Sequence, residues 1–279
     1  MSAVFSDNPQ FARLLAQRDV EVDIPQLMLE FATDVYPDLS AKSSLQELAR
    51  LGEAARQMVS AAGGDIANRL QAVSELLYQQ EGFGGNQDSY YDPRNSYLND
   101  VLERRLGIPI SLAIVYTAVG RQAGLDLFGV GSPGHFMVGC HGNGQTLYID
   151  PFDDGEILDE EACRERIERV LGQQNVISSD HFRAATTREI AARVLRNLKA
   201  AYAMADSWRE ALPVQLRLVA LLPEAPDECR DLGLIYLRNG DPHPATKLLQ
   251  EYVEQAPAEA GEAVLPFLKS ARRMAAERN

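Results

Sequence analysis

Apolar side chains in the first 80 residues recur at helical spacing. Between Ile24 and Val35 they fall three or four positions apart, so they line one face of a helix. The same spacing follows Ser40 and Asp65, and both of these residues are of the types that cap helix N-termini. The pattern predicts a helical N-terminal region.

The composition of the sequence changes after residue 81. The stretch GFGGNQDSYYDPRNSY (82–97) has the residues of a loop, but it carries too many aromatic side chains for a flexible linker. We expect it to pack against the domain. Pro109 then opens the segment PISLAIVYTAVGRQAG, in which apolar residues nearly encircle a helix. Such a helix is expected to be buried on most sides.

Three short apolar segments come next and predict strands: DLFGVGS, HFMVGCH and QTLYIDP. The residues HGNGQ between the second and the third indicate a hairpin turn. A further helix is expected in FDDGEILDEEACRERIERVL. The expected fold class is therefore α+β, mainly helical, with a small antiparallel sheet beside a buried helix.

The C-terminal third is helical and repeats itself. Four pairs of identical residues lie 34 positions apart: Leu198 and Leu232, Tyr202 and Tyr236, Ala211 and Ala245, Pro223 and Pro257. This period and these residue types are typical of the tetratricopeptide (TPR) helix-turn-helix. Gly233 occupies the small position of the second copy, whereas the first copy has Lys199 there and is degenerate. We expect two domains, residues 1–185 and 186–279, the second built of TPR-like hairpins.

Composition narrows the possible partners. The hydrophobic fraction is 46%, enough for a sizeable core, and the net charge of −13 disfavours binding to nucleic acid. We find no apolar run of membrane-spanning length and no signal peptide, so no membrane partner is expected. The three cysteines are odd in number and widely spaced, which fits reduced thiols and a cytoplasmic location better than disulfides or a zinc site.

The order of elements suggests one candidate site. In papain-like folds a nucleophilic cysteine begins a buried helix, where the helix dipole and an imidazole lower the pKa of its thiol. A histidine on a neighbouring strand is the base, and an aspartate on the next strand orients it. His135 at the start of HFMV and Asp150 at the end of LYID correspond to the last two. The hairpin is expected to bring their side chains together near the start of the Pro109 helix.

The stretch GFGGN…YYDPRNSYLNDVLERRLGIPISLAIVY…GVGSPGHFMVG…LYIDPFDDG resembles bacterial proteins of the SirB type. The resemblance covers nearly the whole chain and implies a transglutaminase-like (papain-like) core followed by TPR repeats. The superfamily opens its buried helix with Gly-x-Cys. That motif falls here on residues 107–109, so Pro109 occupies the position of the lost nucleophile. His135 and Asp150 match the other two positions and would form a vestigial dyad.

Other residues could in principle replace the missing thiol. Ser111 is the weak alternative, but about 100° per residue turns it away from the face of Pro109, and a serine in the first helical turn commonly bonds free backbone N–H groups. Cys140 lies an odd number of positions from His135 on the same predicted strand and is expected on the opposite face. Cys163 and Cys229 fall on predicted helices outside this constellation.

Two functions are compatible with these features. The first is a pseudoenzyme, a bacterial regulatory or protein-interaction module that binds a protein or peptide through its TPR groove and the residual cleft. The alternative is a hydrolase or acyltransferase of the superfamily that uses His135 and Asp150 with an unrecognised nucleophile such as Ser111. No cofactor and no metal is expected, because the histidines and cysteines do not cluster and GFGGN lacks the lysine of a phosphate-binding loop.

Overall fold

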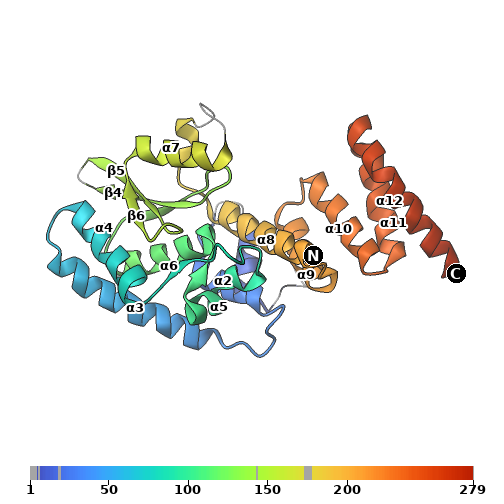
Figure 1. The fold of residues 1–279 in the computed structure, drawn as a ribbon. Coiled ribbons are helices and arrows are strands. Elements are labelled where there is room, and N and C mark those ends of the chain that lie inside the picture. The colour runs from blue at the N-terminus through green and yellow to red at the C-terminus, as the bar shows by residue number, and fades with distance from the viewer. Residues whose placement is uncertain (1–4, 6, 18–19, 143, 173–177, 279) are drawn as a thin grey trace. The chain divides into compact units, whose positions relative to one another are not determined.

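The computed structural model describes residues 5, 7–17, 20–142, 144–172 and 178–278 (Figure 1). Residues 5–194 and residues 195–278 form two compact units, and the division falls inside helix α8 (Thr187–Met204). Within the described ranges, no helix combines the length and the apolar character that a membrane span requires.

The N-terminal region is helical, as the apolar spacing predicts. Its helices are α1 (Pro9–Ala16), α2 (Ile24–Ala32), α3 (Ala41–Ala61) and α4 (Ile66–Ser74), the last continued by a π-helical segment (Glu75–Gln80). The Ser40 hydroxyl caps α3 by accepting the N–H of Lys42. Asp65 occupies the N-cap position of α4, but its side chain makes no capping hydrogen bond. Both residues occupy the predicted N-cap positions, but only the Ser40 side chain makes a capping hydrogen bond.

Helix α6 (Pro109–Gln122) is the central helix of residues 5–194. Proline suits its first position because the missing N–H would have no helical partner there. Every residue from Pro109 to Tyr116 is buried, since α3 contacts the helix along its length and strands β3 and β4 also pack against it. The predicted burial on most sides is confirmed.

The sheet beside α6 is antiparallel, in the order β3–β4–β5–β6. Its strands are β3 (Leu127–Val130), β4 (Met137–Gly142), β5 (Gln145–Asp150) and β6 (Glu156–Leu158). Gly142 pairs with Gln145, so two residues connect β4 and β5, and Gly144 in that turn has a φ of 78°, which favours glycine. The predicted hairpin is confirmed, whereas the short edge strand β6 lay in a segment predicted to be helical.

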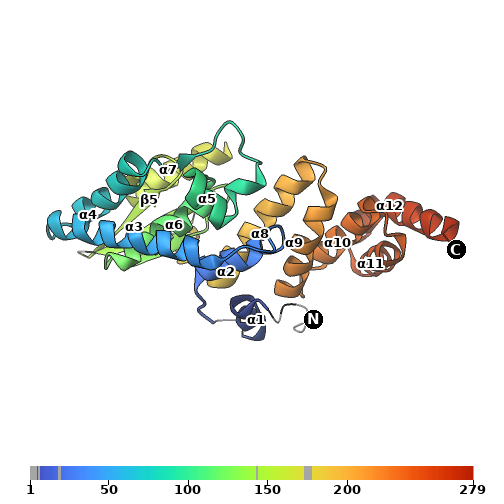
Figure 2. The same cartoon turned by 90° about the horizontal axis from the view of Figure 1, so that it is seen from below.

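Helix α7 (Glu160–Leu171) covers the other side of the sheet. It contacts β5 and β6, whereas α6 contacts β3 and β4, and Figures 1 and 2 show the sheet between the two helices. The interface on the α7 side is a cluster of buried side chains: Val130, Met137, Tyr148, Leu158, Cys163, Ile167 and Phe182. The unit is thus a mainly helical α+β domain, as predicted.

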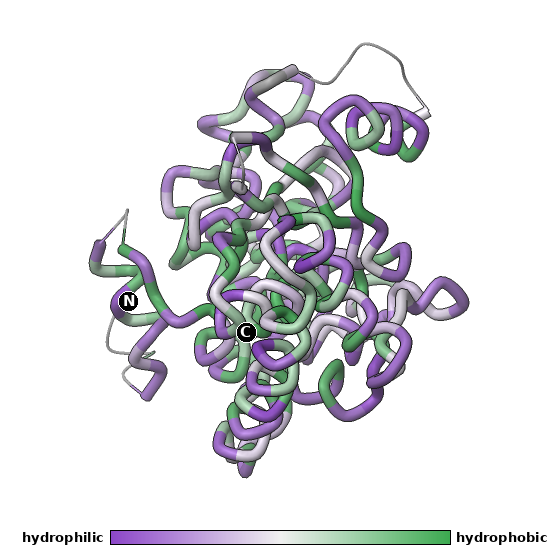
Figure 3. Tube along the Cα trace, turned by 90° about the vertical axis from the view of Figure 1, so that its left-hand side faces the viewer, coloured by the Kyte–Doolittle hydropathy of each residue, from purple (hydrophilic) through white to green (hydrophobic). Residues whose placement is uncertain are grey.

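Residues 195–278 are helical throughout their regular elements. After the end of α8 come α9 (Trp208–Leu221), α10 (Pro226–Arg238), α11 (Pro242–Gln255) and α12 (Ala258–Glu277). Figure 3 shows hydrophobic and hydrophilic residues mixed along the chain. At Gly233 a Cβ would lie 2.9 Å from a methyl of Leu249, so α10 and α11 approach closely where the repeat predicts a small residue. Ala211 and Ala245 are fully buried, as the repeat register requires.

The position that holds Gly233 in the second repeat holds Lys199 in the first, and the lysine has a different role there. Lys199 Nζ lies 2.8 Å from Glu228 Oε2 and 2.8 Å from Asp231 Oδ2 of α10. Glu228 is buried, and it also accepts hydrogen bonds from Arg196 Nε at 2.9 Å and Gln215 Nε2 at 3.0 Å. The degenerate lysine therefore forms ion pairs between helices at the position where the second repeat has close backbone packing.

The repeat register can be tested by overpacking. Ala245→Leu adds three carbon atoms to a fully buried contact and should lower the free energy of unfolding by about 1–3 kcal/mol. Ala263→Leu makes the same change at an exposed position of α12 and should change stability by less than about 0.5 kcal/mol. Urea denaturation of both variants measures the difference, and coincident midpoints would contradict the register.

Candidate functional site

His135 and Asp150 are in direct contact. His135 Nε2 lies 2.9 Å from Asp150 Oδ2, and both side chains are buried. Asp150 is the last residue of β5, where the strand meets the turn that leads to β6. The contact that the order of elements predicts is therefore present.

The sequence prediction for the position of His135 was wrong in one respect, because His135 lies in the loop before β4 and not on that strand. Its N–H donates to the carbonyl of Ser132 at 3.3 Å, and Gly134 has a φ of 69°. A proline in the second position and a positive φ in the third are features of a type II turn. The turn from Ser132 to His135 therefore ends two residues before β4 begins at Met137.

Arg166 of α7 completes the site, and sequence reasoning missed it. Its Nη1 donates to Asp150 Oδ2 at 2.9 Å and to Asp153 Oδ2 at 2.8 Å, and Nη2 pairs with Glu156. Asp153 and Glu156 belong to the acidic run that follows β5, so Arg166 pairs with two carboxylates of this run as well as with Asp150. Among the described residues, no group of three or more histidine, cysteine, aspartate or glutamate side chains could hold a metal ion.

The environment of Asp150 favours its charged form. Burial raises its pKa, but the hydrogen bond and charge of His135, the Phe152 N–H 3.0 Å from Oδ1, and the Arg166 guanidinium together outweigh that effect. The net pKa is below the ordinary value of 3.8. Asp150 is thus a buried carboxylate with three hydrogen-bond donors, which is a well-satisfied arrangement for a buried charge.

Helix α6 begins with a proline, which has no nucleophilic side-chain atom, followed by a serine that is hydrogen-bonded to the backbone. Pro109 occupies the first helical position, and the Ser111 hydroxyl donates to the carbonyl of Asn95 at 2.6 Å while accepting the N–H of Ile108 at 3.0 Å. Within the described part of the chain, Ser111 makes no hydrogen bond to His135. The expected role of Ser111, bonding a free backbone N–H in the first turn, is confirmed.

Comparison with known families identifies the fold. The family model described as the transglutaminase-like superfamily matches residues 42–196, a segment that contains Pro109, His135 and Asp150. The chain belongs to the transglutaminase-like superfamily. A tetratricopeptide repeat model matches residues 198–274, which makes the C-terminal unit a TPR unit, as the 34-residue period predicts.

Relatives of this transglutaminase-like protein are found in bacteria and mammals. A UPF0162 protein of Xylella fastidiosa (strain Temecula1) is 38% identical over 256 residues, which cover 90% of each chain. A UPF0162 protein of Vibrio cholerae is 29% identical over 80% of this chain and 82% of its own. The human F-box only protein 21 is 35% identical over 137 residues, 46% of this chain and 21% of its own. These bacterial homologues agree with the SirB-type assignment, and no solved structure matches the chain.

The three thiols of this superfamily member are poorly suited to nucleophilic attack. Cys140 and Cys163 are buried, and burial raises the pKa of Cys140 to about 11 and that of Cys163 to about 12. Cys163 contacts Met137 within the cluster under α7, and Cys229, which lies on α10, also has a raised pKa because of burial. All three therefore remain thiols at neutral pH, and a thiol is a much weaker nucleophile than a thiolate.

Thiol titration tests this description. With Ellman's reagent at pH 8, the native protein should expose at most one fast-reacting thiol, the partly buried Cys229, and all three should react after denaturation. A Cys229→Ser variant should then show no fast phase. Two or three fast thiols in the native protein would mean that Cys140 or Cys163 is accessible.

The aromatic loop of residues 82–97 packs beside the site, as its composition predicts. It is anchored by the parallel pairing of β1 (Gly84–Gly85) with β2 (Leu106–Gly107) and by the fully buried Asn95, whose side-chain amide donates to the carbonyls of Ser89 and Tyr90. The Tyr90 ring meets the Phe152 ring edge-on, with 6.0 Å between centroids. Phe152 is two positions after Asp150 and donates its N–H to that carboxylate, so this loop packs directly beside the site.

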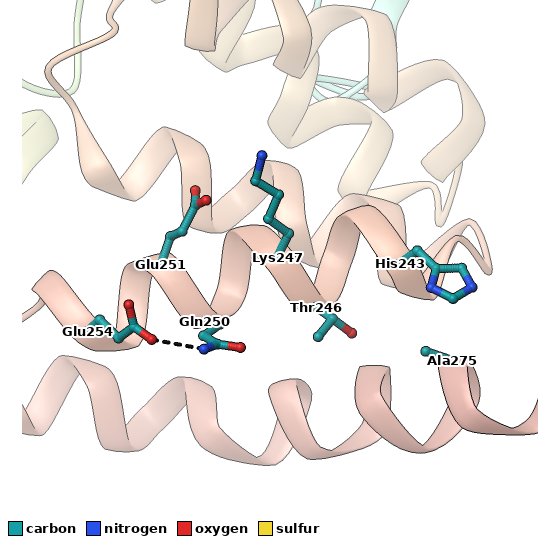
Figure 4. A pocket seen from close by; sticks show the side chains of 7 residues that line it. All are labelled: His243, Thr246, Lys247, Gln250, Glu251, Glu254 and Ala275. Carbon is teal, nitrogen blue, oxygen red and sulfur yellow. Dashed lines mark hydrogen bonds between the residues drawn. The ribbon is translucent and has the colours of Figure 1, made fainter.

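A groove of about 490 Å³ lies in the TPR unit between α11 and α12 (Figure 4). Its lining consists of His243, Thr246, Lys247, Gln250, Glu251, Glu254 and Ala275. Gln250 is held by Glu254 and by Arg272, and Figure 4 shows Lys247 and Glu251 pointing away from α12. The side chains between the two helices are therefore mainly polar, with Thr246, Gln250 and Glu254 on the side that faces α12.

Proposed function

We propose that this protein is a non-catalytic, protein-interaction or regulatory member of the transglutaminase-like superfamily. The observation that carries the proposal is the absence of a usable nucleophile at His135 among the described residues. Pro109 stands where the superfamily has cysteine, and proline has no nucleophilic side-chain atom.

The geometry of His135 supports this proposal. Its Nε2 is engaged by Asp150, which leaves Nδ1 as the nitrogen that would act as a general base. In the described part of the chain, no hydroxyl or thiol donates a hydrogen bond to this nitrogen. The imidazole is also only 7% exposed, so a substrate hydroxyl or a water has little access to it.

The alternative is a hydrolase or acyltransferase that employs an unrecognised nucleophile such as Ser111. The preserved contact between His135 and Asp150 supports this alternative. The two backbone hydrogen bonds of the Ser111 hydroxyl oppose it, because the oxygen would have to lose both in order to attack a substrate. The cost of two lost buried hydrogen bonds makes this the weaker of the two candidates.

The TPR unit supports a role in binding. TPR hairpins present grooves to other proteins, and the groove between α11 and α12 is lined mainly by polar side chains. The residual cleft beside His135, with its exposed Tyr90 and Tyr91, is the second candidate surface. Three widely spaced cysteines fit a cytoplasmic location for this activity.

Site-specific photo-crosslinking in the native host tests the proposal. A photoreactive amino acid is placed at Tyr91 beside the cleft, at the exposed Gln250 in the groove, and at the exposed Gln71 of α4 as the control. We expect discrete crosslinked products of defined mass from the first two positions and none from Gln71. The absence of products from both positions, or equal yields at all three, would contradict a binding role.

A further inference from the structure

Two sets of contacts lead outward from the His135–Asp150 pair. On one side, the carbonyl of Ser132 accepts the N–H of His135 at 3.3 Å and Arg193 Nη1 at 2.8 Å. On the other side, Phe152 donates its N–H to Asp150 and stacks edge-on against Tyr90. Arg193 and Tyr90, at the ends of these two sets of contacts, lie near enough for the charge of Arg193 to oppose the rise that burial causes in the pKa of Tyr90. Besides Arg166, the pair is therefore flanked by a second cation, Arg193, and by the Tyr90 side chain.

Among the described residues, no carboxylate neutralises Arg193. Arg166, Lys199 and Glu228 are, by contrast, buried or half-buried charges with ion-pair partners. Arg193 makes one hydrogen bond, to the Ser132 carbonyl, and in the described part of the chain it has no ion pair. Burial lowers the pKa of Arg193, and the nearby Tyr90 side chain opposes that shift. A half-buried guanidinium without a counter-charge is costly, which points to a partner supplied from outside.

The Arg193 guanidinium is held in place, and it has N–H groups that no acceptor among the described residues uses. It lies over the Phe136 ring, 5.9 Å from the centroid, which restricts its plane. Its Nε and Nη2 have no protein acceptor among the described residues, and neither is sealed from solvent. Tyr90 is 37% exposed, so its hydroxyl can also reach a ligand.

We propose that Arg193 and Tyr90 form a subsite for a carboxylate group of a bound peptide, next to His135. The planar guanidinium matches a carboxylate in geometry as well as charge, and the Tyr90 hydroxyl supplies a further donor. The exposed rings of Tyr90 and Tyr91 flank the subsite with apolar surface, which favours an apolar residue beside the acidic group. This assignment rests on the proposed binding function of the same cleft and names the class of its ligand.

Three dipeptides distinguish the source of the carboxylate. Acetyl-leucyl-glutamate amide has only a side-chain carboxylate, acetyl-leucyl-glutamine has only a C-terminal one, and acetyl-leucyl-glutamine amide has neither. Each is titrated into the ¹⁵N-labelled full chain, and the Nε–Hε signal of Arg193 is followed by NMR. We expect saturable shifts with one or both of the charged dipeptides and none with the neutral one.

Substitutions of Arg193 test whether binding of the charged dipeptides depends on this residue. Arg193→Gln should weaken binding of the charged dipeptide by about tenfold, the usual loss for a charge-assisted hydrogen bond. Arg193→Lys keeps the charge but loses the planar fork, and it should lie between wild type and Arg193→Gln. Arg169→Gln removes the same charge from an exposed position of α7 and should leave binding within about twofold, as expected for a distant, screened charge.

The outcomes separate this inference from the proposal on which it rests. Absence of binding, equal shifts with all three dipeptides, or binding unaffected in both Arg193 variants would overturn the carboxylate subsite and leave a non-catalytic role intact. Release of ammonia from the glutamine dipeptides, lost in His135→Ala, would instead overturn the non-catalytic role. The wild-type titration decides the first question even if an Arg193 variant fails to fold.

Discussion

Replacing Asp150 with alanine is expected to lower the free energy of unfolding by about 3–5 kcal/mol, the typical loss when a buried ion pair is broken from one side. The substitution leaves Arg166 and His135 without the carboxylate oxygen that both contact. It also removes the acceptor of the Phe152 N–H. Urea denaturation followed by circular dichroism measures the change.

Asp153→Ala is the matched control for this substitution. Asp153 contacts the same Nη1 atom of Arg166, at 2.8 Å, but its side chain is 63% exposed. A solvated ion pair of this kind contributes about 0–1 kcal/mol. Equal losses for Asp150→Ala and Asp153→Ala would contradict the central place of Asp150 in the network.

The Asp150 carboxylate should also make the free energy of unfolding depend on pH in acid. The pKa of Asp150 is lower in the folded protein than its ordinary value of 3.8, so folding favours the charged form. That contribution is complete above the ordinary pKa and is lost as the pH falls through the lowered one. Below about pH 4 the wild type should therefore lose stability more steeply than Asp150→Asn, as linkage between protonation and folding requires. Parallel acid profiles would contradict this.

Replacing Glu228 with alanine should have the second large effect, a loss of about 3 kcal/mol or more, as for other buried charge networks. Glu228 is the shared acceptor of Arg196, Lys199 and Gln215, and its side chain is only 5% exposed. The preceding residue supplies the control, because the side chain of Asp227 is 68% exposed and pairs with Arg230. Asp227→Ala should cost about 1 kcal/mol or less. Similar midpoints for the two variants in urea would show that α10 does not depend on this network.

Much of the fold could be predicted because it depends on local patterns. Four of its features can be read directly along the sequence: the helical spacing, the proline at the start of α6, the two-residue hairpin and the 34-residue period. The contact between His135 and Asp150 followed from the hairpin that joins their segments. Strand β6 has three residues, too few for an alternating pattern to be visible, and β1 and β2 have two each.

The rest of the site could not be predicted because its contacts join distant segments. Arg166 lies 16 residues after Asp150, within a charged run that also reads as an ordinary solvated helix face. Nothing around Arg193 marks it as a neighbour of Tyr90, which precedes it by about a hundred residues. The position of His135 was misjudged because HFMV has the alternation of a strand, whereas the Pro-Gly turn holds its first two residues outside the ladder.

An acyl-transfer assay tests the central claim of a non-catalytic domain most directly. Wild type and His135→Ala are incubated with casein and an amine donor, with a thioester, and with a nitrophenyl ester, and product formation is compared with buffer alone. We predict rates equal to the buffer control for both proteins, because Pro109 and the bonded Ser111 leave His135 without a nucleophile to activate. A wild-type rate more than about tenfold above buffer that disappears in a folded His135→Ala variant, a difference within the range of general-base catalysis, would contradict the account.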